Sequence, residues 1–172
     1  MILSDVDITA ERESKSLCIS PYSPDCLQPA SYDVHLSSEF IEPSSDRHVL
    51  LYKCLEITLQ PMQFMLGSTY ETLTIPSHLV ARVEGKSSLA RLGLMVHITA
   101  GFIDPGFSGN ITLELLNVSR VPITLVAGMK IAQISFQRLL TPCVRPYGSK
   151  ELMSKYQNSV GTVASKRVGT KR

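Results

Sequence analysis

Long hydrophobic runs are missing from this 172-residue chain, and no segment approaches the roughly 18 consecutive apolar residues of a membrane-spanning helix. The first residues, MILSDVDITAERE, carry acids and lack the apolar core of a secretory signal, so we expect a cytoplasmic protein that binds no membrane. Strong charge is missing as well. The net charge of +2 argues against a protein that binds nucleic acid, although a local basic site for a small anion stays open.

Paired cysteines are also missing. The four cysteines, Cys18, Cys26, Cys54 and Cys143, are widely spaced, and no two have the C-x2-C spacing of a zinc site. We therefore expect free thiols in a reducing compartment, and no zinc. With 44% hydrophobic and 19% charged residues and no internal repeat, the chain has the composition of one soluble domain. We expect that domain to span residues 1–165 and the basic residues 166–172 to form a flexible tail.

The residue pattern predicts one short helix followed by many short strands. Residues 5–13 favour a helix with Ser4 as its N-cap. From Tyr32 on, apolar and polar residues alternate as they do in strands, with turns such as residues 43–46 between the segments. The strand-like segments are residues 48–52, 55–59, 64–74, 80–84, 94–99, 110–118 and 130–140. Such a series favours an all-β barrel or sandwich, and the few aliphatic residues beyond Pro142 predict a surface arm.

The stretch GKSSLARLGLMVHITAGFIDPGFSGNITLE, residues 85–114, concentrates the residue types that can carry chemistry. Its first four residues, GKSS, resemble the end of a phosphate-binding loop. The Walker pattern, however, needs a glycine where Val80 stands, and the preceding residues are not rich in glycine. We therefore reject a P-loop.

A helix start remains as the interpretation of this segment. We expect Ser87 or Ser88 as N-cap, one helical turn over residues 89–92, and Gly93 just after its end. Free amides at a helix start attract anions, and Ser87 and Arg91 would share one helical face. A capped surface turn that binds nothing is the alternative.

The segment after this turn has two interpretations. Residues 100–106, AGFIDPG, form either a plain hairpin or a backbone that approaches a flat ligand closely, as glycines allow. Glu114 lies on the strand face opposite Ile111, Leu113 and Leu115. It either faces solvent or lies in a cleft, where a carboxylate can act in general acid–base chemistry. His97 is more typical of a packed or hydrogen-bonded histidine than of a ligand.

Together and in this order, these residues resemble the core of the dCTP deaminase family, a branch of the trimeric dUTPase superfamily. The resemblance extends to PASYD at residues 29–33 and to GMKIAQ at residues 128–133. RPY at residues 145–147 and SKYQ at residues 154–157 resemble the family's C-terminal lid, which would begin at about residue 145. The resemblance runs from residue 1 to about residue 165, and its central motif is highly specific.

The resemblance implies an all-β fold, a distorted jelly-roll β-barrel of the dUTPase type with a few short helices. It implies a homotrimer with sites between subunits, dCTP or dUTP as ligands, and dTTP as a feedback inhibitor. Magnesium (Mg²⁺) would be held mainly by the substrate's phosphates. Carried over by position, the residues that would bind substrate are Lys86, Ser87, Ser88, Leu89, Ala90, Arg91, Ala100, Asp104, Thr112, Leu113, Glu114, Gln133, Tyr147, Lys155 and Ser159.

The implied reaction is hydrolytic deamination without zinc, because the H-x-E and P-C-x-x-C signature of zinc deaminases is absent. In the implied mechanism Glu114 drives a water onto C4 of cytosine and then delivers a proton to the departing ammonia. Ser87 and Arg91 would position this water and stabilise charge beside it. With Asp104, these are the four implied catalytic residues.

The hairpin carries the feature that predicts the product. Deaminases that stop at dUTP resemble TAHRID at this place, whereas residues 99–104 of this chain are TAGFID, with Gly101 and Phe102 in the middle. This resembles the bifunctional branch, which also releases diphosphate and gives dUMP. Asp104 matches the dUTPase aspartate that would activate water toward the α-phosphate. We therefore hypothesise dCTP to dUMP, ammonia and diphosphate. The alternatives are a deaminase that releases dUTP, a dUTPase alone, and a nucleotide-binding regulator without turnover.

One residue departs from the family pattern. Ser159 stands two residues after Gln157, where many relatives carry a glutamine that contacts the phosphates. We expect the shorter side chain to weaken lid closure or to change the affinity for phosphate.

Overall fold

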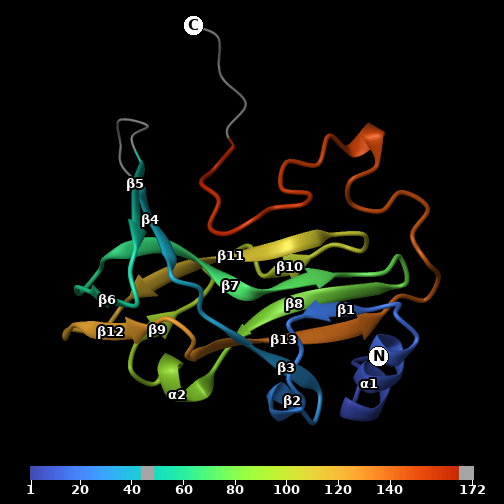
Figure 1. Ribbon diagram of the computed structural model, residues 1–172, viewed down its shortest axis with the longest axis horizontal. Coiled ribbons are helices and arrows are strands. Elements are labelled where there is room, and N and C mark those ends of the chain that lie inside the picture. The colour runs from blue at the N-terminus through green and yellow to red at the C-terminus, as the bar shows by residue number, and fades with distance from the viewer. Residues whose placement is uncertain (44–48, 167–172) are drawn as a thin grey trace, which may run out of the picture.

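The computed structural model describes residues 1–43 and 49–166, and most of them lie in antiparallel sheets (Figure 1). The larger sheet has the order β5-β4-β7-β11-β9, and β1 pairs with β7 outside this path. Its strands are β1 (Cys18–Ser20), β4 (Glu39–Pro43), β5 (Val49–Lys53), β7 (Phe64–Thr74), β9 (Leu94–Met95) and β11 (Ser108–Asn117).

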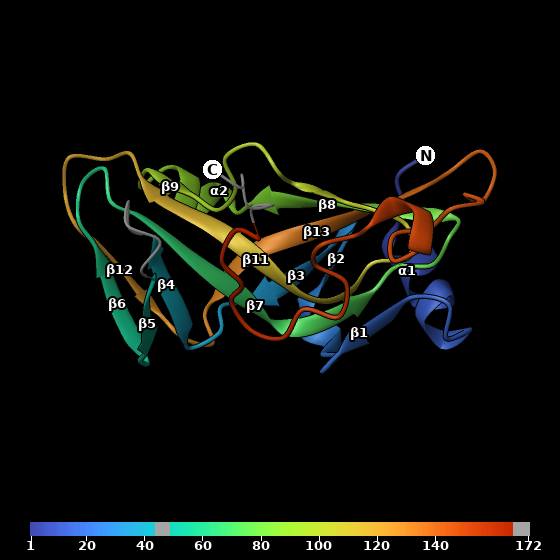
Figure 2. The same cartoon turned by 90° about the horizontal axis from the view of Figure 1, so that it is seen from above.

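The second sheet has the order β10-β8-β13-β3-β2. Its strands are β2 (Leu27–Gln28), β3 (Ser31–His35), β8 (Leu79–Gly85), β10 (Phe102–Ile103) and β13 (Lys130–Arg138). A further pair, β6 (Glu56–Leu59) with β12 (Ile123–Val126), lies beside β5 at one end of the molecule, with the N-terminal helix α1 at the other (Figures 1 and 2). The prediction of an all-β protein is confirmed, and the described residues form separate sheets without closing a single barrel.

Apolar side chains from both sheets form one buried cluster. Tyr32 and Val34 from β3, Leu73 from β7, Leu113 from β11 and Phe136 from β13 are all fully buried in it. Burying each large apolar side chain contributes about 1.5–3 kcal/mol, so this cluster fixes how the two sheets are arranged. Among the described residues, no helix is both long enough and apolar enough to cross a membrane.

Strand β11 shows the alternation that the sequence predicts. Ile111, Leu113 and Leu115 are buried, whereas Thr112 and Glu114 on the other face are only partly buried. The apolar face therefore anchors β11 to the core, and the polar face is left to carry functional side chains.

Helix α1 (Asp5–Glu13) has the predicted bounds and the predicted N-cap. The Ser4 hydroxyl accepts from the Asp7 N–H, and the Asp7 carboxylate accepts from the Ser4 N–H, which makes a capping box. The 3-10 helices η1 (Pro24–Cys26) and η2 (Lys150–Leu152) add one turn each.

Helix α2 (Ser87–Ala90) corrects the prediction for this segment. The N-cap is Lys86 and not Ser87 or Ser88, so the turn begins two residues before the predicted range of 89–92. The reason is a tertiary contact that holds the Lys86 side chain, described below. The helix ends at Ala90 with Arg91 as its C-cap, so Gly93, at φ +96°, lies two residues past the C-cap and not directly after the helix as predicted.

The predicted strands agree well with the observed ones where the chain is described. The predicted range 64–74 is that of β7, and the range 80–84 lies within β8. The predicted strand 94–99 is wrong beyond Met95, because the chain leaves the sheet there. Residues 44–48, which include most of the predicted turn and His48, and residues 167–172 of the predicted tail lie outside the described part.

Candidate functional site

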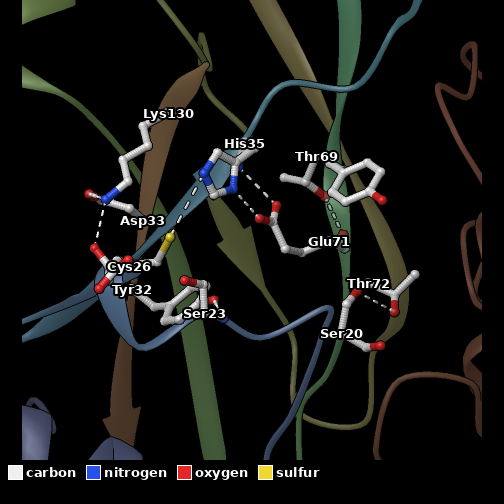
Figure 3. A network of polar contacts seen from close by, with 12 residues as sticks. Ser20, Ser23, Cys26, Tyr32, Asp33, His35, Thr69, Glu71, Thr72 and Lys130 are labelled. Atoms are coloured by element: carbon white, nitrogen blue, oxygen red, sulfur yellow. Dashed lines mark hydrogen bonds and ion pairs between the residues drawn. The ribbon is translucent and has the colours of Figure 1, made fainter. Parts of the chain in front are cut away.

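The start of α2 is fixed by a buried carboxylate. The Lys86 Nζ donates to Asp33 Oδ1 at 2.6 Å, and the Asp33 side chain is only 3% exposed. A second lysine, Lys130, places its Nζ 3.4 Å from the other oxygen of Asp33 (Figure 3). The two cations offset the cost of burying the Asp33 charge, and the contact explains why Lys86 stays in extended backbone before the helix.

Gln133 supports the same end of the second sheet. Its amide Nε2 donates to the carbonyl of Gly85 at 3.2 Å, and its Oε1 accepts from the Ser31 hydroxyl at 2.9 Å. Gln133 is thus tied to the residue that precedes Lys86. The structure brings these two predicted site residues together through backbone and side-chain contacts.

The polar residues of α2 face outward. Ser87, Ser88 and Arg91 are exposed, while Leu89 packs against the core. Among the described residues Arg91 forms no ion pair, so its guanidinium is available to an anion. The remaining predicted residue of the helix, Ala90, is exposed as well.

Glu114 holds the chain that follows β9. Its Oε2 accepts from the Ile98 N–H at 2.7 Å, and its own N–H donates to the Val96 carbonyl at 3.0 Å. The side chain is half-buried, and its carboxylate is held by a backbone amide. The other two predicted site residues on β11 lie on opposite faces of the strand: Leu113 is in the core, and Thr112 is half-buried on the same face as Glu114.

The backbone of Gly101 lies against the imidazole ring of His97. A Cβ at this position would lie 3.0 Å from Cε1 of His97, so the glycine leaves room for that ring. The Gly101 carbonyl accepts from the Val83 N–H at 2.8 Å, which fixes the backbone beside β8. His97 Nδ1 is buried without a hydrogen-bond partner among the described residues, and the Phe102 side chain is 58% exposed.

The predicted hairpin, residues 100–106, is not a paired hairpin: β10 pairs with β8 and β11 pairs with β7 and β9, so this segment is a turn that connects the two sheets. The turn presents Asp104 to solvent. Its carboxylate is exposed, and its carbonyl accepts from the Phe107 N–H at 3.1 Å, so the backbone shapes the turn without help from the carboxylate. Gly106 at φ +89° completes the turn, and its carbonyl accepts from the Gln157 side chain at 2.8 Å. Ala100, at the start of this segment, is exposed.

The C-terminal arm, the chain beyond Pro142, lies along β11 and along the turn 100–106 of the same chain. The Tyr147 N–H donates to the Pro105 carbonyl at 2.7 Å, and the Tyr147 hydroxyl accepts from the Tyr156 N–H at 2.9 Å. Ser159 is buried: its hydroxyl donates to the Tyr156 carbonyl, and its own carbonyl accepts from the N–H of Asn110. The predicted surface arm therefore has specific anchors.

The end of the arm continues along the same strand. The Val163 N–H donates to the Thr112 hydroxyl at 3.2 Å, so Thr112 has an intrachain partner. Lys155 is exposed. For Ser159, a contact with substrate stays a prediction, and in the free chain its polar atoms are bonded to neighbours in the arm and β11.

The absence of a side chain at Gly109 allows the backbone of the arm at Ser159 to lie close to β11. A Cβ on Gly109 would lie 2.6 Å from the Ser159 carbonyl oxygen, at φ +139°. Gly109→Ala is expected to lower the free energy of unfolding by about 2–3 kcal/mol and to make the arm beyond residue 145 more sensitive to protease. Gly128→Ala is the matched control, since Gly128 also has a positive φ but no atom within 4 Å of its Cβ position. It should cost only about 1–2 kcal/mol and leave the arm protected. Equal effects of the two variants on proteolysis would contradict this role of the close approach.

The predicted site residues fall into separate groups within one chain. One group is α2 with Gln133, and the other is the turn 100–106, the polar face of β11 and the arm. Among the described residues no hydrogen bond or ion pair joins Ser87 or Arg91 to Asp104, Glu114 or Tyr147. Two open surface hollows, of about 330 and 450 Å³, are lined by none of the predicted residues.

Asp33 is the functional candidate that sequence reasoning left out. The sequence shows it only as one polar position in an alternating strand, and residues 31–34 all turn out to be buried. Asp33 becomes a functional candidate only through its contact with Lys86, which is 53 residues away in the chain. Only its place within PASYD pointed toward it.

Residues 2–139 match the family model described as dCTP deaminase-like. The chain belongs to this family. The resemblance inferred from GKSSLARLGLMVHITAGFIDPGFSGNITLE is thereby confirmed.

Close relatives of this family member share nearly its whole length. A protein of Clavibacter michiganensis named "dCTP deaminase, dUMP-forming" is 48% identical over 96% of this chain and 90% of its own length. A Tropheryma whipplei protein of the same name is also 48% identical, over 96% of this chain and 92% of its own.

Solved structures show the same fold. The 2′-deoxycytidine 5′-triphosphate deaminase of Agrobacterium tumefaciens gives a TM-score of 0.67 at 23% identity, covering 80% of this chain. This chain spans about half, 48%, of that longer protein. The dUTPase of Staphylococcus bacteriophage 80alpha gives a TM-score of 0.52 at 16% identity, over 76% of this chain and 95% of its own. The all-β fold of this family member is therefore of the dUTPase type.

Proposed function

We propose that this protein converts dCTP to dUMP, ammonia and diphosphate. The observation that carries the proposal is its 48% identity, over nearly the full length of both chains, to relatives named "dCTP deaminase, dUMP-forming". The sequence TAGFID, with Gly101 against His97, adds support from this chain itself.

In the deamination step, Glu114 acts as general base and then as general acid. Its carboxylate takes a proton from a water that attacks C4 of the cytosine ring, and a C–O bond forms. The carboxyl group then protonates the amino group, the C–N bond breaks, and ammonia leaves. Ser87 donates a hydrogen bond that positions the water, and the Arg91 guanidinium stabilises the charge that develops beside it.

In the second step, Asp104 activates a water for attack on the α-phosphorus. The new P–O bond forms as the bond to the β-phosphate bridge breaks, so dUMP and diphosphate are the products. Lys86 and Arg91 bind the triphosphate as cations. The exposed position of Asp104 in the turn 100–106 leaves its carboxylate accessible to a substrate.

Magnesium is the cofactor that suits this chain's residues. The ion would be bound mainly through the substrate's phosphates and water, as is usual for Mg²⁺ at nucleotide sites. When bound, Mg²⁺ neutralises phosphate charge and favours departure of diphosphate.

The complete site is assembled between subunits of a homotrimer. Support comes from the contacts within one chain: α2 and Gln133 are tied to the second sheet, the turn 100–106 and β11 are tied to the arm, and no polar contact among the described residues links α2 to that turn, β11 or the arm. A neighbouring subunit would supply the missing half. The end product of this route, dTTP, would bind at the same site as a feedback inhibitor, and the compartment would be the cytoplasm.

The test is product analysis with dCTP and Mg²⁺, and separately with dUTP. The proposal predicts dUMP and diphosphate from dCTP, with ammonia. Accumulating dUTP without diphosphate would instead indicate a plain deaminase, and turnover of dUTP alone would indicate a dUTPase. Binding of dCTP without turnover would indicate a regulator. Each of the last three outcomes overturns the proposal.

Lys86→Gln is expected to raise KM for dCTP at least about tenfold and to change kcat within about threefold, since a hydrogen bond to a charged group contributes about 1.5–3 kcal/mol. The fold should persist, because Lys130 remains near Asp33 to compensate its buried charge. Lys53→Gln serves as control, because Lys53 is an exposed lysine paired with Glu39 on β4. Steady-state kinetics measure both. An unchanged KM in Lys86→Gln would remove Lys86 from phosphate binding.

A further inference from the structure

The loop between β9 and β10, residues 96–101, lies next to the groups of both proposed reaction steps. On one side the Val96 carbonyl accepts from the Glu114 N–H at 3.0 Å, and the Ile98 N–H donates to Glu114 Oε2 at 2.7 Å. On the other side the chain enters β10, and Asp104 follows that strand directly. The loop therefore connects the carboxylate of the deamination step to the carboxylate of the diphosphate-release step.

The imidazole of His97 lies inside this loop, against Gly101. A Cβ at position 101 would lie 3.0 Å from Cε1 of the ring and 3.1 Å from each of its two nitrogens. Because these distances are nearly equal, that Cβ would lie over the face of the ring and not at its edge. The ring nitrogen Nδ1 is buried without a hydrogen-bond partner among the described residues, so packing holds the ring in place at this side.

The ring explains why a glycine stands at position 101. Many glycines are required by a positive φ, but the φ of Gly101 is not positive, so the backbone conformation does not call for glycine. Carbon atoms pack best at about 3.5–4.0 Å, so even an alanine Cβ would press on the His97 ring. In the dUTP-releasing pattern TAHRID a histidine stands at this position, and its side chain would not fit beside that ring.

The backbone at Gly101 in turn determines where Asp104 lies. The Gly101 carbonyl accepts from the N–H of Val83 on β8 at 2.8 Å. The next two residues form β10, in which Phe102 is paired with Arg82 of β8. A shift of the backbone at Gly101 would therefore move the start of β10, and with it the carboxylate of Asp104.

We infer that His97 is a positioning residue for diphosphate release and that it acts as a matched pair with Gly101. The inference rests on the proposed function. The ring holds the backbone at Gly101 so that Asp104 can activate water at the α-phosphorus, and it thereby contributes to the choice between dUMP and dUTP. Deamination depends less on the ring, because the contacts of Glu114 with this loop are made by backbone groups.

His97→Ala is the first test, with ammonia, diphosphate and nucleotides measured during turnover of dCTP with Mg²⁺. We expect diphosphate release to fall at least about tenfold, with dUTP accumulating, because a misplacement of about 1 Å can cost about 10²-fold in rate. Ammonia release should stay within about threefold of that of the unaltered protein. His78→Ala is the matched control: it removes another half-buried imidazole, which contacts Glu11 of α1, and it should still give dUMP.

A double-mutant cycle distinguishes a matched pair from two independent kinds of damage. In the unaltered protein Gly101→Ala should lower diphosphate release about tenfold, because the new Cβ presses on the ring. Added to His97→Ala, the same change should have less than about a twofold further effect, since the ring is gone, whereas independent effects would multiply to about a hundredfold. Thermal unfolding of each variant checks that it is folded.

The outcomes separate this inference from the proposed function. Equal amounts of diphosphate and ammonia from His97→Ala would overturn the inference alone, as would a parallel fall of both products or effects that multiply in the double variant. Accumulation of dUTP by the unaltered protein would overturn the proposed function, and the inference with it.

Discussion

Glu114→Gln is expected to lower ammonia release from dCTP by about 10²–10⁴-fold, the range over which a general acid–base group contributes. The substitution is nearly isosteric, and the amide oxygen can still accept from the Ile98 N–H, which Glu114 Oε2 does at 2.7 Å. The chain after β9 should therefore keep its shape. What is lost is the group that takes a proton from water and returns it to the leaving ammonia.

Binding separates this loss from a damaged site. Calorimetry should give a dCTP affinity for Glu114→Gln within a few-fold of that of the unaltered protein. Glu13→Gln, at the exposed end of α1, is a control for removing one negative charge and should retain full activity. Full ammonia release by Glu114→Gln would exclude Glu114 as the proton carrier.

Asp104→Asn is expected to uncouple the two reactions, so that dCTP is converted to dUTP and diphosphate release falls at least about 10²-fold. The turn 100–106 is held by its backbone, with the Asp104 carbonyl accepting from the Phe107 N–H and Tyr147 bound at Pro105. An asparagine should therefore leave the turn intact. Deamination should persist within a few-fold because it depends on Glu114.

Chromatography of the nucleotides during turnover checks this outcome. The unaltered protein should give dUMP, and Asp104→Asn should accumulate dUTP. Asp25→Asn, an exposed aspartate in η1, should behave like the unaltered protein. An equal fall in both steps would show that Asp104 serves binding, and an unchanged yield of dUMP would remove it from the second step.

Local patterns were enough to predict the parts of the fold that depend on neighbouring residues. Ser4 and the acids after it define the N-terminus of α1, because a cap is a contact within one turn. The alternation of Ile111, Leu113 and Leu115 with polar residues likewise reports which side of β11 faces the core. Both features are readable within about ten residues.

Long-range contacts account for what the sequence did not reveal. Lys86 became the N-cap of α2 because Asp33, on another strand, holds its side chain. The predicted strand 94–99 ends early, and the Ile98 N–H donates to the Glu114 carboxylate instead of to a neighbouring strand. Local residue preferences contain no information about such a long-range contact. Ser159 was expected to face substrate, and in the free chain it is packed beside Gly109.

The candidate site was predicted as a set of residues and not as a geometry. Ser87, Arg91, Asp104 and Glu114 were identified by a family resemblance, and the structure shows them divided between α2 on one side and the turn 100–106 with β11 on the other. The proposed trimer would bring the two groups together, and a single sequence contains no signal for how copies of the chain meet.

The measurement that most directly tests the account is the ratio of diphosphate to ammonia released from dCTP, followed on one sample from the first turnover. We predict equal amounts at every time, with no free dUTP, because both steps occur before the nucleotide leaves. Ammonia without diphosphate, accompanied by an equal amount of dUTP, would contradict the central claim.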